Sequence, residues 1–245
     1  MTVTFSHLGA YGRRGNAMFQ IAATVGYAKK YNVPFQFPEW KHQSEFSLSD
    51  SYYVPKGMLK YTSEVIEQGF SYSELPYKAD CSLHGYFQSW KYFEHCQDYI
   101  REIFRPREPE DSNLFRGLCA VHVRRGDYVQ FPEHHPTMEM TYYNQAIERV
   151  PASKFLIFSD DVKWCEKNFI GDKFIVTDPA SSAIDFRMMM ACNHFIIGNS
   201  SFSWWAAWLG EHQDKVVVAP QKWFGTALVN THPTRDLIPP DWVII

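Results

Sequence analysis

The amino-acid sequence predicts an α/β protein built on parallel sheets, and two observations support that prediction. Short apolar runs alternate with helical patterns through the second half of the chain. Polar segments that carry glycine and serine follow several of these runs directly. Parallel sheets are covered by helices on both faces and bind ligands outside the carboxyl ends of their strands. The pattern therefore predicts the fold class and also the edge of the sheet where the site lies.

The first half of the chain contains fewer clear elements. Residues 2–8 alternate like a short strand and lead into the loop GAYGRRGN, after which a helical pattern begins at Ala17. The segment VPFQFP is typical of a strand, and CSLHGYFQS predicts another, followed by a helix at about residues 90–104. Residues 40–79 are rich in aromatic residues and proline and show no periodicity. No element is predicted there.

The second half is regular. The polar, turn-rich segment RPREPEDSN is the best candidate for a linker. Apolar runs then predict strands at 118–123, 154–158, 173–177, 194–197 and 215–219. Helical patterns separate them near 139–150, 161–169, 182–192 and 202–210.

Composition narrows the classes of protein and partner. The 245 residues are 45% hydrophobic and 21% charged, which is typical of a folded globular chain. The net charge of −3 argues against nucleic acid as a partner. No run of 18 uncharged apolar residues occurs, so we expect no transmembrane segment and a cytoplasmic protein. Five widely spaced cysteines and the histidine spacings favour neither disulfides nor a zinc site, so no metal is expected.

Three predicted strands end in polar residues. The first is followed by RRGDY, the second by Ser159, Asp160 and Asp161, and the fourth by GNSSFSWW. Because the carboxyl ends of parallel strands meet at one edge of a sheet, we expect these segments to lie close together.

Two adjacent arginines follow the first of these strands. Neighbouring residues that leave a strand point in opposite directions, so only one of them can face a ligand. Arg124 has the same parity as His122, and we assign both to the site. Arg125 is expected to brace the loop through a carboxylate.

The segment GNSS lies at the start of a predicted helix. Exposed amides and hydroxyls at a helix amino end bind phosphate well, although a serine there is most simply a helix cap. The acidic pair Asp160 and Asp161 is interpreted as positioning a nucleotide or capping a helix. The loop GRRGN matches neither a dinucleotide fingerprint nor a P-loop.

These motifs together resemble a known family. VHVRRGDY, FSDD and IGNSSFSWWAAWLG are similar to successive signatures of the α-1,2-fucosyltransferases, glycosyltransferase family eleven. The opening GRRGNAMFQIAATVGYAKKYNVPFQFPEW and the closing DLIPPDWVII resemble the start and the tail of that family.

The resemblance implies a GT-B-type α/β fold, in which two Rossmann-like halves with parallel sheets face a cleft. Residues 1–108 would form the acceptor-side domain and residues 109–245 the GDP-fucose-binding domain, with the tail 230–245 a candidate to return to the first half. It also implies inverting transfer of L-fucose from GDP-fucose to the 2-hydroxyl of a galactose-terminated glycan acceptor, without a cofactor or metal.

The resemblance also implies roles for individual residues. His122 and Asp185 would hold the guanine, Arg124 with Ser200 and Ser201 would contact the phosphates, and Asn16 would face the sugar and β-phosphate. Arg124, Asp127 and Asn16 are the expected catalytic residues. The expected donor-binding residues are completed by Gly15, Asp160 and Phe202.

Some alternatives stay open. Asp127, Glu133 and His135 are candidates for the base that accepts the acceptor's proton, and Asp127 is preferred. Asp127 could instead hold Arg125 in place.

A GDP-fucose transferase of other regiochemistry, such as α-1,6, is an alternative activity. A non-catalytic carbohydrate-binding protein is a further alternative, suggested by the aromatic content of 17%.

Overall fold

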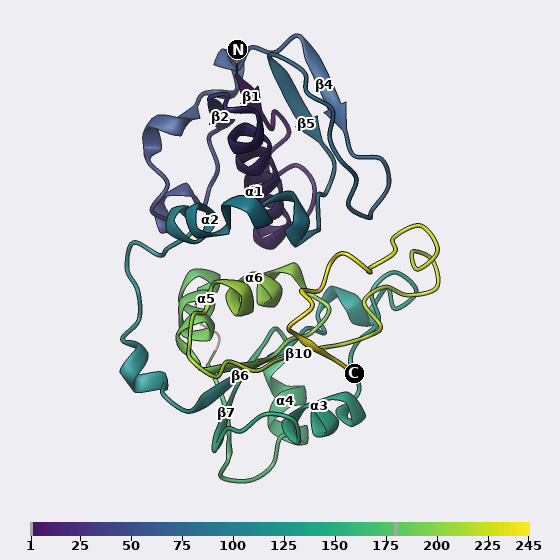
Figure 1. Ribbon diagram of the computed structural model, residues 1–245. Helices are drawn as coiled ribbons and strands as arrows, with labels where there is room; N and C mark the ends of the chain where they lie inside the picture. The colour runs from purple at the N-terminus through teal and green to yellow at the C-terminus, as the bar shows by residue number, and fades with distance from the viewer. Residues whose placement is uncertain (1, 179–180) are drawn as a thin grey trace. The chain divides into compact units, whose positions relative to one another are not determined.

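The computed structural model describes residues 2–178 and 181–245 and shows two compact units (Figure 1). The first unit is Met1–Glu108 with Thr231–Pro239, and the second is Pro109–Asn230 with Pro240–Ile245. The boundary between Glu108 and Pro109 falls within the segment RPREPEDSN. Each unit is built on one sheet whose strand pairs are all parallel.

The first unit contains a five-stranded sheet. Its strand order is β3-β2-β1-β5-β4. The strands are β1 (Val3–Thr4), β2 (Phe35–Pro38), β3 (Tyr53–Val54), β4 (Ser63–Ile66) and β5 (Cys81–His84). Two of them, β3 and β4, lie in the segment for which the sequence predicted no element. The first strand is much shorter than predicted, because the chain turns directly after Phe5.

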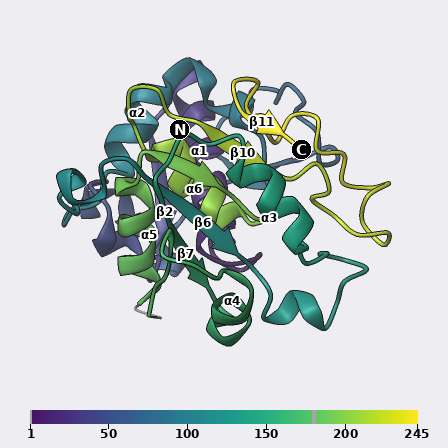
Figure 2. The same ribbon diagram turned by 90° about the horizontal axis from the view of Figure 1, so that it is seen from below.

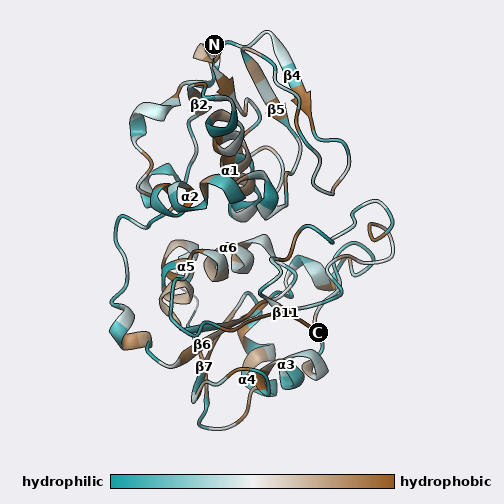
Figure 3. Cartoon of the chain, in the orientation of Figure 1, coloured by the Kyte–Doolittle hydropathy of each residue, from teal (hydrophilic) through white to brown (hydrophobic). Residues whose placement is uncertain are grey.

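Helix α1 (Arg14–Tyr31) is the centre of the first unit, and it starts three residues earlier than predicted. It is buried along most of its length rather than on one face. At its end Asn32 adopts a left-handed conformation, and the N–H of Val33 donates to the carbonyl of Ala28 at 3.0 Å, which satisfies an otherwise unpaired carbonyl. The shorter α2 (Gln97–Ile103) follows two single 3₁₀ turns. Figure 3 shows hydrophobic residues along β5 and a largely hydrophilic α2.

The second unit contains a six-stranded sheet, and all five strands predicted for it are confirmed. Its strand order is β11-β10-β9-β6-β7-β8. The strands are β6 (Leu118–Val123), β7 (Lys154–Ser159), β8 (Phe174–Val176), β9 (His194–Ile196), β10 (Val217–Ala219) and β11 (Val243–Ile244). The last strand was not predicted, and it pairs with β10 from the end of the chain.

Helices cover both faces of this sheet, as Figures 1 and 2 show. One face carries α3 (Met140–Ile147) and α4 (Val162–Asn168), and the other carries α5 (Ser182–Ala191) and α6 (Ser201–Leu209). Alternate side chains of β6 therefore lie on opposite faces of the sheet, each face being covered by a different pair of helices. Val121 and Val123 pack with residues of α3 and α4, whereas the His122 ring lies 5.8 Å from the ring of Phe202 in α6.

The tryptophans of α6 are core residues, as the helical period predicts. Trp204 and Trp205 are fully buried, and the Trp204 ring lies 5.5 Å from that of Trp242, near the end of the chain.

The five cysteines are free thiols, four of them buried. In the part of the chain that the structure describes, no helix combines the length and apolar character that crossing a membrane requires.

Gly26 tests the packing around α1. A Cβ at this position would overlap the carbonyl oxygen of Tyr92, a backbone atom that cannot rotate away. We expect Gly26→Ala to lower the free energy of unfolding by about 2 kcal/mol, the usual cost of overpacking, despite the better helix propensity of alanine. Gly57→Ala is the matched control, since a Cβ there meets open space. Urea denaturation that shows equal stability for both variants would contradict this packing.

Candidate functional site

The polar ends of three neighbouring strands form the candidate site. β9, β6 and β7 are adjacent in the sheet, and Val123 at the end of β6 pairs with Ser159 at the end of β7. The segments that the sequence placed at this edge therefore lie together, as predicted. A Cβ on Gly198, which follows β9, would lie 3.9 Å from the Cβ of Arg124.

Arg124 is the cation at the centre of this edge. Its guanidinium forms ion pairs with the carboxylates of Asp127 and Asp160, and its side chain is only 16% exposed. The guanidinium carbon also lies 5.3 Å from the centre of the Tyr128 ring. Burial of a guanidinium requires such partners, because an unpaired buried charge is costly.

Arg125 points the other way, as strand parity predicts. Its Nε lies 3.0 Å from Asp161 Oδ2, and its guanidinium carbon lies 4.3 Å from the centre of the Trp164 ring. The interpretation of Asp127 as the residue that holds Arg125 is wrong. Asp127 begins a 3₁₀ turn directly after Gly126, which returns its carboxylate to Arg124 instead.

Asp160 fixes the loop that carries the two arginines. Its Oδ1 accepts the backbone N–H of Arg125 at 2.8 Å and that of Gly126 at 3.2 Å, while Oδ2 faces Arg124. A side chain on Gly126 would overlap this carboxylate, so the glycine leaves room for it. Asp161 accepts the N–H of Trp164 at 3.2 Å and caps α4, which confirms the capping interpretation for Asp161 alone.

His122 is a buried, neutral imidazole beside Arg124. The pKa of His122 is lowered to about 4, mainly by burial; the charge of Asp160 opposes this shift and the positive charge of Arg124 adds to it. Among residues 2–178 and 181–245, no hydrogen-bond partner of the His122 Nδ1 atom is found. A Cβ on Gly198 would lie 3.7 Å from that nitrogen. The ring therefore has an unused polar atom facing the glycine-bearing turn.

The helix that follows this turn directs its amino end toward the same edge. Ser200 is the N-cap of α6, and its hydroxyl accepts the N–H of Phe202 at 3.3 Å. The cap leaves other amides of the first turn without partners within the helix, and the helix dipole adds partial positive charge there. Ser201 opens the helix, so Ser200 and Ser201 have the positions that the sequence predicted.

Two residues that support the site were not predicted. Asn199 is buried, and its Nδ2 donates to the carbonyls of Pro136 at 3.0 Å and Trp223 at 2.9 Å. The Tyr128 hydroxyl donates to the Asn199 carbonyl at 3.1 Å. Together they join the loops after β6 and β10 to the start of α6. The only signal in the sequence was an asparagine between a glycine and a capping serine.

The remaining predicted residues lie on other elements. Asp185 lies in the first turn of α5, which packs on α6 through a Phe186–Phe202 ring contact at 5.3 Å. Gly15 and Asn16 belong to the other unit, in the first turn of α1. Their roles stay predictions.

The other candidate bases have partners of their own. Glu133 lies 3.0 Å from Nδ1 of His134, and both side chains are about half exposed. The His135 ring stacks on Tyr128 at 4.7 Å. Arg14, the first residue of α1, is buried and its guanidinium lies 2.8 Å from the Glu45 carboxylate.

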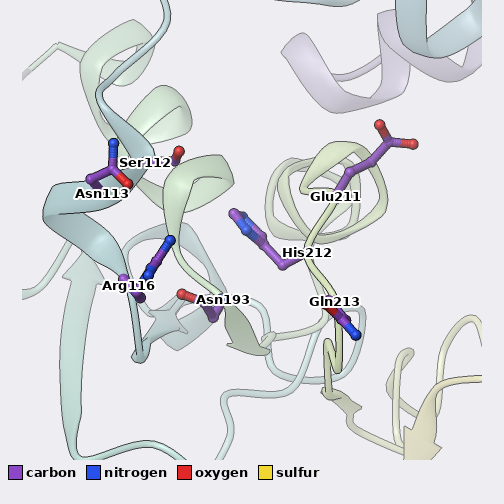
Figure 4. A pocket seen from close by; sticks show the side chains of 7 residues that line it. All are labelled: Ser112, Asn113, Arg116, Asn193, Glu211, His212 and Gln213. Atoms are coloured by element: carbon purple, nitrogen blue, oxygen red, sulfur yellow. The ribbon is translucent and has the colours of Figure 1, made fainter.

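A separate polar pocket of 480 Å³ lies at the opposite edge of the same sheet. Arg116, Asn193 and His212, which precede β6, β9 and β10, point into it, and Glu211 points away (Figure 4). Parallel sheets bind ligands at the carboxyl edge, which favours the Arg124 site over this pocket. Within the described ranges, no group of three or more histidine, cysteine or acidic residues is arranged to hold a metal ion.

Known proteins share this architecture. The crystal structure of NodZ alpha-1,6-fucosyltransferase soaked with GDP-fucose matches with a TM-score of 0.53 and 12% identity. The match covers 85% of this chain and 92% of that chain. At this identity the likeness establishes the fold, and the two parallel sheets with their helices define a GT-B-type α/β protein.

The chain belongs to glycosyl transferase family 11, whose family model matches residues 32–245. The resemblance seen in the motifs is thereby confirmed.

Relatives of the chain carry related names. It is 34% identical over 174 residues to the O-antigen biosynthesis glycosyltransferase WbnK of Escherichia coli, covering 62% of this chain and 58% of that protein. It is 32% identical to the alpha-1,2-colitosyltransferase of Escherichia coli, and the match covers 69% of this chain and 63% of that protein. It is 26% identical to galactoside alpha-(1,2)-fucosyltransferase 2 of Oryctolagus cuniculus, and the match covers 82% of this chain and 66% of that protein. The chain spans less than two thirds of the length of each of these relatives.

The pKa of His122 predicts a pH dependence of stability. The folded-state pKa is about 4 and the unfolded value is 6.5, so the unfolded chain binds the proton first as the pH falls. The resulting stability is fully present above pH 6.5 and is lost as the pH falls toward 4. Relative to a His122→Gln variant, wild type should lose on the order of 3 kcal/mol over this range. Parallel stability curves for the two proteins, measured by urea denaturation, would refute a buried neutral imidazole.

Proposed function

We propose that this chain catalyses inverting transfer of L-fucose from GDP-fucose to the 2-hydroxyl of a galactose-terminated glycan. Family membership and the relative named galactoside alpha-(1,2)-fucosyltransferase 2 support the proposal. The single observation that carries it is the position of Arg124 at the carboxyl edge, beside the amino end of α6. A guanidinium and helix amides are the groups that bind a diphosphate.

The reaction breaks the bond between the fucose C1 and the β-phosphate oxygen. The electron pair of that bond stays on the phosphate, and the acceptor oxygen forms the new bond to C1 from the opposite face. Negative charge therefore builds on the β-phosphate as the bond breaks. Arg124 and the amides of α6 stabilise this charge more in the transition state than in the ground state, which accelerates the reaction.

The ion pairs of Arg124 give Asp127 a defined role. A diphosphate that binds Arg124 competes with the two carboxylates, and Asp127 is the more exposed of them, at 44% against 28% for Asp160. Asp160 is also held by two backbone N–H groups. Asp127 is therefore the carboxylate that yields to the phosphate, and it then serves as the base for the acceptor hydroxyl.

The other predicted residues complete the proposed site. His122 and Asp185 hold the guanine, with the free Nδ1 of His122 as one polar contact. Ser200 and Ser201 contact the phosphates, and Phe202 packs beside His122. Gly15 and Asn16, which belong to the first unit, would contact the sugar and β-phosphate. Free, mostly buried cysteines support a reducing, cytoplasmic location.

A second donor is a candidate, because the relative named alpha-1,2-colitosyltransferase is more similar to this chain than the rabbit fucosyltransferase is. Transfer of colitose would use the same phosphate-binding residues. The names of these relatives favour a 1,2 linkage over the α-1,6 alternative.

GDP release from GDP-fucose should require a galactoside, and NMR of the product should show substitution at O2. Release with water alone, or no release with any galactoside, would contradict the proposal.

We expect activity without a metal ion. Arg124 and the α6 amides supply the positive charge that a divalent ion supplies in other transferases. Turnover should therefore survive excess EDTA in metal-free buffer. Complete loss that Mg²⁺ or Mn²⁺ restores would overturn this expectation and make Asp160 and Asp161 candidate ligands.

The two arginines should respond differently to the same substitution. Arg124→Lys keeps the charge but loses the planar two-pronged contact, and should lower kcat on the order of 10²–10³-fold. Arg125→Lys is the matched control, since it disturbs only the contacts with Asp161 and Trp164. It should lower Tm and reduce kcat much less than Arg124→Lys does. An inactive, stably folded Arg125→Lys beside a normal Arg124→Lys would assign the phosphate to Arg125.

A further inference from the structure

Four rings gather at the carboxyl edge of the first sheet. His7 and Tyr11 follow β1, and His84 and Tyr86 lie at the end of β5, the strand next to β1. The His84 ring lies 5.4 Å from each of the His7 and Tyr11 rings, and Tyr86 lies 6.3 Å from Tyr11. We call these four residues the ring cluster. All four are at least partly exposed, and Tyr86 is 38% exposed.

The loop that presents Tyr86 is held in an unusual conformation. The Glu67 carboxylate, at the end of β4, accepts the backbone N–H of Tyr86 at 2.7 Å and that of Phe87 at 2.9 Å. Phe87 has a φ of +52°, which is disfavoured for a bulky residue, and its buried ring packs 6.2 Å from that of Phe5. Backbone conformations of this kind occur preferentially at functional sites, where the surroundings enforce them.

The same loop is joined to the proposed catalytic residue of this unit. Gln88, one residue after Phe87, is buried, and its Nε2 donates to Asn16 Oδ1 at 3.0 Å. Asn16 lies in the first turn of α1, and Tyr11 lies in the loop before that helix. The ring cluster and Asn16 therefore lie on the same two segments, the one that joins β1 to the start of α1 and the one at the end of β5.

We propose that the ring cluster binds the acceptor sugar, a neutral pyranose. One face of a galactose ring presents C–H groups, which the negative face of an aromatic ring attracts. The phenol and imidazole groups of the same side chains can hydrogen-bond the sugar hydroxyls. Exposed rings held by a rigid loop bind without a large loss of side-chain entropy. The inference rests on the proposed function and names the residues that would hold its acceptor.

Acceptor titrations test the inference. Lactose and N-acetyllactosamine are the probes, at saturating GDP-fucose, with Tyr86→Leu and Tyr11→Leu as variants. Each variant should raise KM for the galactoside about tenfold, while Tyr86→Phe, which keeps the ring and loses only the phenol hydroxyl, should raise it less. Tyr61→Leu is the matched control, a tyrosine of the same unit that is 37% exposed and outside the ring cluster. Calorimetry should show GDP affinity within about twofold of wild type in all variants, and Tm should confirm folding.

The outcomes separate this inference from the proposed function. Unchanged KM in Tyr86→Leu and Tyr11→Leu, with an active wild type, would overturn the ring cluster and leave the transferase activity standing. A matching loss of GDP affinity would also overturn it, because the rings would then belong to the donor site. A wild-type chain that transfers fucose to neither galactoside would contradict the proposed function itself, and the inference with it.

Discussion

The ion pairs of Arg124 with Asp127 and Asp160 are the interaction on which the candidate site depends. A guanidinium this buried needs counter-charges, and two carboxylates leave it with a local surplus of negative charge. Under the proposed function, a diphosphate that binds Arg124 competes with these carboxylates. Asp127 is the more exposed of the two, at 44% against 28%, and is proposed to be the one that yields. Donor binding would then release a carboxylate near the reacting sugar.

The two units use the same device to fix a functional loop. In each, a carboxylate directly after one strand accepts two successive backbone N–H groups from the loop after a neighbouring strand in the sheet. Asp160 holds Arg125 and Gly126, and Glu67 holds Tyr86 and Phe87. A glycine leaves room for the carboxylate in both cases, Gly126 in one and Gly85 in the other. Burial raises the pKa of Glu67 to about 7, so the loop after β5 is held by a carboxyl group that titrates near neutrality.

The sequence predicted the second unit well because short apolar runs alternate there with clear helical patterns. The parity of β6 alone separated Arg124 from Arg125, and the structure confirms that separation. The strands β3 and β4 lie in the segment rich in aromatic residues and proline that shows no periodicity, and β11 has only two residues, so none of them was predicted. The partner of Asp127 was predicted wrongly, because a 3₁₀ turn after Gly126 reverses the direction that simple alternation gives. Asn199 and Glu67 act through backbone groups of distant loops, which no local pattern encodes.

GDP affinity is the measurement that tests the central claim most directly. Calorimetry would compare wild type with Arg124→Met and Asp127→Asn, all verified as folded. Arg124→Met removes two charge-assisted hydrogen bonds to the diphosphate, each worth about 1.5–3 kcal/mol. This variant should therefore bind GDP on the order of 10²-fold more weakly, or weaker still. Asp127→Asn should bind GDP about tenfold more tightly, since the arginine is freed from a competing carboxylate. Unchanged GDP affinity in Arg124→Met, or weaker binding in Asp127→Asn, would contradict the exchange of a carboxylate for a phosphate at Arg124.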